Sequence, residues 1–219
     1  MEKYGTIPPK FTKDWWIHYW TYYKLHFLLG TFLFFAVVHL IYTNVTAVNH
    51  DLKIKYLTTN ALIPTESLTI LEEKATEVSG DVTNNKKTEV AILPETMPAF
   101  NDYSQAQMLQ AVQARTIAEL QVAENQIYIV DKAIAELLHS YQCMLPVTEW
   151  AGDGFQDKTY CDIALSLSEV DLFNDSGFNT SDLYMCVISP SEDCLKDKEC
   201  VKKFENGKAV AKELIKGVS

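Results

Sequence analysis

The chain has 219 residues, 47% of them hydrophobic, and a formal net charge of −10. Four of its 19 basic residues and two of its 29 acidic residues precede Asn44, so the remainder carries a net charge of −12. This charge repels nucleic-acid phosphates, and Arg115 is the one arginine that could make bidentate phosphate contacts, so the composition argues against nucleic-acid binding.

An uncharged apolar segment lies near the N-terminus. Residues 25–48 contain no Asp, Glu, Lys or Arg. As a helix they would extend about 36 Å, against about 30 Å for the hydrocarbon core of a membrane. A buried core helix of this length would normally show a charged face, so the segment predicts a transmembrane helix. It is too long and too far from Met1 for a cleaved signal peptide, which favours an uncleaved signal-anchor.

Lysines around this segment predict its orientation. Four lysines precede it, whereas only Lys53 and Lys55 follow closely. Because cytoplasmic flanks carry the excess of positive charge, we expect a cytoplasmic N-terminus and an extracellular C-terminal domain in a single-pass protein of the cell membrane. The expected organisation is a cytoplasmic arm with an interfacial aromatic segment (1–24), a membrane-spanning helix (25–48) and one extracytoplasmic domain (49–219).

Aromatic side chains cluster just before the apolar segment. Thr12 is a candidate N-cap, so one helix is expected to run from about Lys13 into the lipid bilayer. One stripe of rings repeats every three or four residues along it: Trp16, Trp20, Tyr23 and Phe27. Such rings anchor a helix at the lipid headgroups, and the alternative is a docking seam for a polytopic membrane protein such as a transporter. His39, inside the segment, is a further candidate for this seam.

Beyond residue 49 the apolar pattern predicts alternating strands and helices. Strands are expected at 52–57, 90–93, 127–130, 163–167 and 184–188. Helices are expected at 68–78, 103–123, 133–139 and 201–216. This alternation is typical of a single α/β domain with a mixed or mainly parallel sheet of about five strands.

Several residues in these elements have specific expected roles. The first strand alternates apolar and polar positions, which favours a half-buried strand, and Pro94 is expected to end the second strand. Asp131 follows a buried strand and is expected to cap the next helix. The long helix is expected to face the core with Met108, Leu109, Val112, Ile117, Leu120 and Ala123.

All five cysteines lie in the expected extracytoplasmic part, where disulfides form readily. Cys194 and Cys200 are the first candidate pair and Cys143 and Cys161 the second, while the odd number leaves at least one thiol unpaired. The cysteine spacings match no zinc signature. The chain has no Gly-rich phosphate loop and no GxSxG or HExxH motif. The sequence therefore predicts no metal, no cofactor and no catalytic residue.

Residues 114–150, ARTIAELQVAENQIYIVDKAIAELLHSYQCMLPVTEW, resemble part of the first lobe of bacterial extracellular solute-binding proteins of the type II periplasmic fold. The resemblance implies that a strand delivers Asp131 to the edge of a cleft and that a Leu-Pro-Val turn follows at 145–147. The arm at 4–26 resembles that of uncharacterised bacterial single-pass proteins with such a domain. That family closes two lobes around its ligand, whereas the residues after the membrane segment suffice for one.

Two functions are expected on these grounds. The first is a membrane-tethered, non-enzymatic interaction module that engages a protein, peptide or solute beside a membrane partner such as a transporter. The second is a sensor or delivery lobe that binds a small ligand or peptide. Paired carboxylates such as Glu72 and Glu73 are also found in hydrolases, but in so acidic a domain they more often form solvated faces.

Overall fold

The computed structural model describes residues 9–46, 50–60 and 64–216. The chain divides into two compact units, residues 1–48 and 49–219. The first eight residues of the expected cytoplasmic arm, and the last two of the expected membrane span, lie outside the described residues.

The first unit contains one long helix, α1 (Lys13–Thr46). Thr12 caps it as predicted, because Thr12 Oγ1 accepts a hydrogen bond from Trp15 N at 3.3 Å. Within α1, Tyr23–Thr43 forms a 21-residue stretch with a mean hydropathy of 2.0. This stretch is about 31 Å long at 1.5 Å per residue, so its length and composition are compatible with a membrane anchor. Its large apolar side chains are exposed, Leu25 by 72% and Phe32 by 71%.

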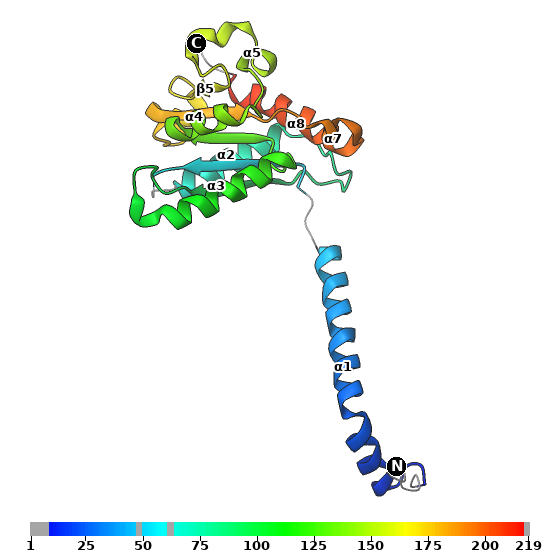
Figure 1. Cartoon of the computed structure of the whole chain (residues 1–219). Coiled ribbons are helices and arrows are strands. Elements are labelled where there is room, and N and C mark those ends of the chain that lie inside the picture. The colour runs from blue at the N-terminus through cyan, green and yellow to red at the C-terminus, as the bar shows by residue number, and fades with distance from the viewer. Residues whose placement is uncertain (1–8, 47–49, 61–63, 217–219) are drawn as a thin grey trace. The chain divides into compact units, whose positions relative to one another are not determined.

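The second unit is built on one mixed sheet, which confirms the predicted α/β class (Figure 1). Its strands within the described residues are β1 (Leu52–Thr58), β2 (Val90–Thr96), β3 (Ile127–Asp131), β4 (Thr159–Tyr160), β5 (Ala164–Ser166) and β6 (Leu183–Val187). They lie in the order β2-β1-β3-β6-β5-β4. The first three are mutually parallel, and each later neighbour is antiparallel.

Among the described residues the sheet has six strands where about five were expected, because β4 had not been predicted. β4 and β5 form a hairpin whose turn places Cys161 and Asp162 at φ 51° and 61°. The three residues Cys161, Asp162 and Ile163 separate the paired residues Tyr160 and Ala164, and hairpin loops of this length are usually marked by a glycine. Cys-Asp gives no such signal, so a two-residue strand beside it could not be recognised.

Helices cover both faces of the sheet. On one face lie α2 (Thr65–Val78) and α8 (Lys198–Leu214), and on the other α3 (Ala106–Gln121) and α4 (Lys132–Tyr141). The short helices are α5 (Val147–Trp150), α6 (Asp171–Asp175), α7 (Glu192–Lys196) and the 3-10 turns Tyr103–Gln105, Asp153–Lys158 and Thr180–Asp182. The result is a three-layer domain with an apolar core on each side of β1 and β3.

α8 lies close to the sheet where Gly207 faces Gln126. A Cβ atom on Gly207 would lie 2.5 Å from the Cβ atom of Gln126, which is shorter than any ordinary contact. Gln126 is itself fixed, because its Oε1 accepts a hydrogen bond from Lys53 N at 2.9 Å. The glycine therefore sets how closely the last helix packs on the sheet.

Lys55 is buried, so the expectation that β1 is half-buried was wrong. The Lys55 side chain is 1% exposed, and its Nζ lies 2.5 Å from Glu95 Oε2 and 3.1 Å from Glu119 Oε2. Arg115 Nε lies 2.8 Å from Glu119 Oε1 and joins the network from the surface. β1 lies between two strands and under helices on both faces, so the polar position Lys55 is covered as well as the apolar ones.

The core face of α3 also differs from the prediction. Val112 and Leu120 are buried as expected, but Met108 is 53% exposed and Ile117 is 37% exposed. Glu119 is buried instead, because α3 turns it toward the Lys55 ammonium. The buried face of α3 therefore carries a charged residue beside Val112 and Leu120.

β2 continues through Pro94 to Thr96, so the predicted end of this strand was wrong. β2 is the edge strand of the sheet, and Pro94 pairs in register with Tyr56 of β1. A proline lacks a backbone N–H, but an edge strand needs hydrogen bonds on one side only, so the strand can pass through it.

Candidate functional site

The parallel strands reverse their winding direction between β1 and β3. From β1 the chain passes through α2 on one face of the sheet to β2, whereas from β3 it passes into α4 on the opposite face. Two neighbouring strand ends therefore send their connections in opposite directions. In open α/β sheets this topological switch point leaves a crevice outside the carboxyl ends of the strands, and ligands bind there.

A polar cavity of about 430 Å³ lies at this switch point. Tyr56 and Thr59 line it from the end of β1, and Asp131 lines it from the end of β3. Asp182 lines it from the segment before β6. Because β6 is antiparallel to β3, with Leu183 opposite Asp131, the residues before β6 reach the same edge of the sheet. The volume falls within the range of small-molecule sites. We call this cavity the switch-point crevice.

Asp131 fastens the two sides of the switch-point crevice together. Its Oδ2 accepts hydrogen bonds from the backbone N and the Oγ1 of Thr59, both at 2.6 Å. Its Oδ1 accepts from Ile134 N at 3.1 Å, which confirms the predicted cap of α4. One carboxylate thus joins the end of β1 to the start of α4, and it is 8% exposed at the wall of the crevice.

The switch-point crevice is electrostatically negative. Its lining contains Asp131 and Asp182 and, among the residues that the structure describes there, no lysine or arginine. Burial, together with the negative charge of Asp131, raises the pKa of the Asp182 carboxyl. Burial and the same charge raise the pKa of the Tyr56 hydroxyl. Such a site disfavours anions and accommodates neutral or cationic polar groups.

Lys132 is not among the residues that line the crevice, but its charge lowers the pKa of the Asp182 carboxyl, against the larger effects of burial and of Asp131. The Lys132 ammonium lies 4.9 Å from the ring centroid of Tyr160, a cation–π contact. The backbone N–H of Lys132 does donate to Asp182 and holds that carboxylate beside α4. This backbone hydrogen bond therefore fixes the position of Asp182 at the crevice.

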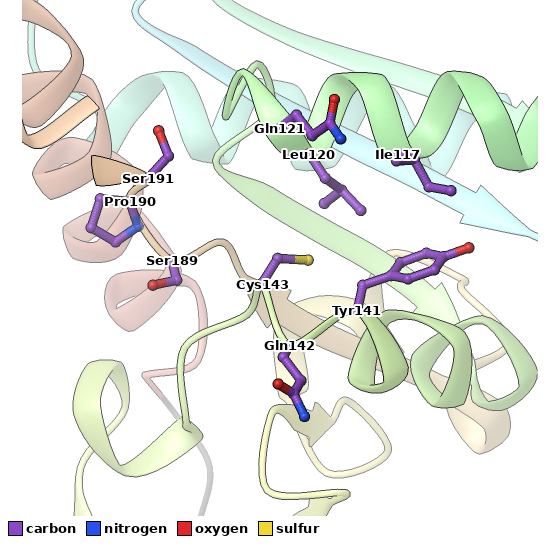
Figure 2. Close-up of a pocket in the computed structure, with 9 residues that line it drawn as sticks. All are labelled: Ile117, Leu120, Gln121, Tyr141, Gln142, Cys143, Ser189, Pro190 and Ser191. Carbon is purple, nitrogen blue, oxygen red and sulfur yellow. The ribbon is translucent and has the colours of Figure 1, made fainter. Parts of the chain in front are cut away.

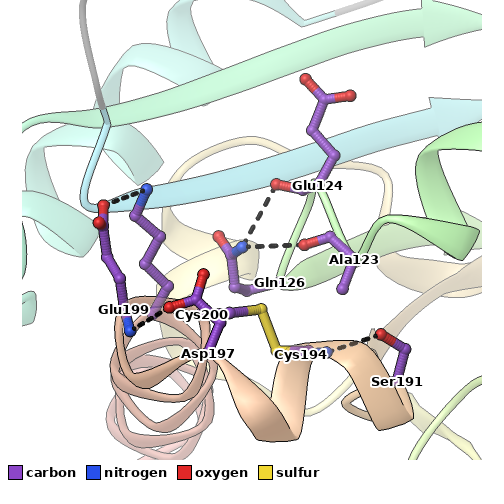
Figure 3. Close-up of a disulfide and its surroundings, with 9 residues drawn as sticks. Ala123, Glu124, Gln126, Ser191, Cys194, Asp197, Glu199 and Cys200 are labelled. Atoms are coloured by element: carbon purple, nitrogen blue, oxygen red, sulfur yellow. Dashed lines mark hydrogen bonds and ion pairs between the residues drawn. A yellow bond between two sulfur atoms is a disulfide. The ribbon is translucent and has the colours of Figure 1, made fainter.

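The structure contains a disulfide between Cys194 and Cys200, the first candidate pair of the sequence analysis (Figure 3). It joins α7 to the first turn of α8. Ser191 caps α7 by accepting a hydrogen bond from Cys194 N at 3.2 Å, and Asp197 caps α8 by accepting from Glu199 N at 2.9 Å. The crosslink closes a loop with a sequence separation of 6, so it stabilises a local helix junction.

The second candidate pair is not formed. Cys143, Cys161 and Cys186 are free thiols. Cys161 lies in the β4–β5 turn, whereas Cys143 follows α4. No group of three or more His, Cys, Asp or Glu side chains that could hold a metal ion occurs in the described part of the chain.

The expected aromatic seam of α1 separates into two rows. Trp20 and Phe27 lie together, with ring centroids 6.0 Å apart. Tyr23 instead stacks on Tyr19 at 5.1 Å, and Tyr19 stacks on Trp15 at 5.5 Å. Trp16 contacts Trp15 and Tyr19. His39, the further candidate for the seam, accepts a hydrogen bond from Thr43 through its backbone carbonyl. The row that runs through Trp15 and Tyr19 had not been predicted.

Sequence reasoning identified Asp131 but missed Thr59 and Asp182. Thr59 could have been found by the same signal, because it directly follows the buried strand β1 and the carboxyl ends of parallel strands share one edge. Asp182 gave no such signal. It reaches the crevice only because β6 pairs antiparallel with β3, and strand pairing cannot be read from local periodicity.

The fold and the cavity define an α/β domain with a negative polar crevice at the carboxyl edge of its parallel strands. Comparison of the chain with protein families, with curated proteins and with solved structures gives no match.

Proposed function

We propose that this chain is a membrane-anchored, non-enzymatic binding protein whose second unit takes a polar, neutral or cationic ligand in the switch-point crevice. The observation that carries the proposal is the coincidence of the cavity with the switch point between β1 and β3, where the chain leaves two neighbouring strands in opposite directions. The ligand would be a small molecule or one residue of a peptide, given a cavity of about 430 Å³.

A binding role is favoured over catalysis by the contacts of Asp131. Its two oxygens accept hydrogen bonds from Thr59 and from Ile134, so the carboxylate is committed to fixing the crevice walls. A general base needs an oxygen within reach of the proton that it removes. Asp182, which is exposed at the rim, is the side chain that we assign to ligand contact.

Ligand binding can be tested by thermal unfolding of the full chain in lipid nanodiscs, with a panel of primary amines, amino acids and neutral sugars. At a concentration 100 times its dissociation constant, a true ligand should stabilise the domain by about 2.7 kcal/mol. Asp182→Lys should abolish that stabilisation, because it reverses the charge at the crevice. Asp193→Lys, at an exposed position on α7, is the matched control and should leave it unchanged. If no compound stabilises the chain, or if the effect survives in Asp182→Lys, the crevice is not the site.

The membrane anchor is the second part of the proposal. We assign Tyr23–Thr43 to the bilayer, with the N-terminus cytoplasmic and residues 49–219 outside, on the strength of its exposed apolar surface and the lysine bias. The chain should stay in the membrane fraction during alkaline carbonate extraction, whereas Phe34→Lys combined with Val38→Lys should release it. Protease added to spheroplasts should digest the outer domain, and protection of that domain would reverse the proposed orientation.

A second candidate function is that of an accessory subunit beside a polytopic membrane protein such as a transporter. The exposed ring rows of α1 favour it, because stacked rings such as Tyr19 and Tyr23 present a stiff surface that another helix can contact. The same rings also suit the lipid headgroup region. Ligand delivery to such a partner would unite both expected functions in one protein.

A further inference from the structure

A second cavity, of about 490 Å³, lies at the opposite edge of the sheet from the switch-point crevice. Helix α3 contributes Ile117 and Leu120 to its lining, and the end of α4 with the residues after it contributes Tyr141 and Cys143. The segment after β6 contributes Pro190 (Figure 2). Figure 2 shows the Cys143 sulfur and the Tyr141 ring on one side of this space and the two α3 side chains on the other. The cavity is thus bounded by three segments that are distant in sequence.

The lining of this cavity is uncharged. None of its nine residues is Asp, Glu, Lys, Arg or His, although 22% of the chain is charged. Burial raises the pKa of the Cys143 thiol, so that group too stays neutral near pH 7. An ion that entered would lose hydration without meeting a counter-charge, which disfavours charged ligands. The lining also contains uncharged polar side chains that can hydrogen-bond to a neutral ligand, namely Gln121, Gln142, Ser189 and Ser191.

The walls of the cavity are held by backbone contacts. Ser189 N donates to the Cys143 carbonyl at 2.8 Å, and Leu145 N donates to the Val187 carbonyl at 2.8 Å. Ser191, which also lines the cavity, caps α7. The disulfide joins α7 to α8. The cavity is therefore formed before any ligand arrives, as is usual for small-molecule sites.

We propose that this cavity is a second binding site, specific for a small, uncharged, mainly apolar molecule such as a short alkyl chain with one polar end. It is independent of the switch-point crevice, because it lies at the amino end of β3 and is lined by other residues. Cys143 reports its occupancy, since a ligand between Leu120 and the thiol blocks access to the sulfur.

The test uses the wild-type full chain in lipid nanodiscs and measures the rate at which N-ethylmaleimide alkylates Cys143, read for each cysteine by peptide mass spectrometry. The probe is 1-hexanol. At a concentration about ten times its dissociation constant, it should slow Cys143 alkylation about tenfold, because only the unoccupied fraction reacts. Cys161, a half-buried free thiol outside the cavity, is the internal control and should react at an unchanged rate. Hexanoate and hexylammonium, of equal length but charged, should give no protection.

A filled-cavity variant completes the test. Ile117→Trp places a large ring at a position 37% exposed on the cavity wall, and it should remove the effect of 1-hexanol. Met108→Trp, at a 53% exposed position on the same helix but outside the cavity, should keep that effect. The proposal is overturned if 1-hexanol slows Cys143 and Cys161 equally, if hexanoate protects as well as 1-hexanol, or if no protection is seen. Failure of the switch-point crevice to bind amines or sugars would leave these results unaffected.

Discussion

Replacing Lys55 by methionine should lower the free energy of unfolding by about 3 kcal/mol, toward the lower end of the range for breaking a buried ion pair. The variant leaves Glu95 and Glu119 without the ammonium that lies 2.5 Å and 3.1 Å from their oxygens. Arg115 still reaches Glu119 from the surface, which limits the loss. Urea unfolding followed by tryptophan fluorescence measures the effect, because Trp150 is the one tryptophan of the second unit and is 1% exposed.

Lys53→Met is the matched control for this prediction. Lys53 is on the same strand, but its side chain is 29% exposed and it pairs with Glu124, which is 43% exposed. Such surface pairs contribute about 0–1 kcal/mol, so the control should change stability little. Adding Glu95→Gln and Glu119→Gln to Lys55→Met should restore at least part of the loss, because the remaining buried groups are then neutral. Equal effects of Lys55→Met and Lys53→Met would mean that the buried network contributes nothing.

Asp131→Ala should destabilise the second unit by about 2–4 kcal/mol, because it removes both a helix cap and charge-assisted hydrogen bonds. The N–H groups of Thr59 and Ile134, now bound at 2.6 Å and 3.1 Å, would lose their acceptor. Amide hydrogen exchange should therefore become faster at both residues. Urea unfolding gives the total change, and the exchange rates show that it arises at the strand end and the helix start.

Two variants delimit the role of Asp131. Asp131→Asn keeps one carbonyl oxygen and should lose less stability than the alanine variant, because that oxygen can serve Ile134 or Thr59 but not both. Asp197→Ala removes the exposed cap of α8, which accepts from Glu199 N at 2.9 Å, and should cost about 1 kcal/mol. Unchanged exchange at Thr59 in Asp131→Ala would contradict the proposed tie between β1 and α4.

Local patterns were sufficient for the elements that depend on neighbours in sequence. The apolar run at Ile127–Val130 predicted β3, and the aspartate after it predicted the N-cap of α4. The spacing of Cys194 and Cys200 predicted the disulfide. The long, mainly apolar helix also follows from composition alone. The strand, the helix cap and the disulfide are each decided by residues within about one or two helical turns of one another.

The features that sequence reasoning missed depend on distant partners. Lys55 is buried because two strands flank β1 and because Glu95 and Glu119 arrive from other elements. Met108 was assigned to the core because its spacing fits an apolar stripe, yet the rotation of α3 follows the ion pair of Glu119. Periodicity records how polar and apolar residues alternate, but it does not identify which element lies opposite each face.

The amino-acid sequence by itself determined an apolar N-terminal helix, an acidic α/β domain after it, and a carboxylate at the end of a buried strand. Only the tertiary structure decided that Asp182 joins Asp131 in one crevice and that α3 encloses an uncharged cavity beside Cys143. The physical reason is that helix formation and capping act between near neighbours, whereas a cavity exists only after strands pair and helices pack, and that pairing is set by contacts between residues far apart in the chain.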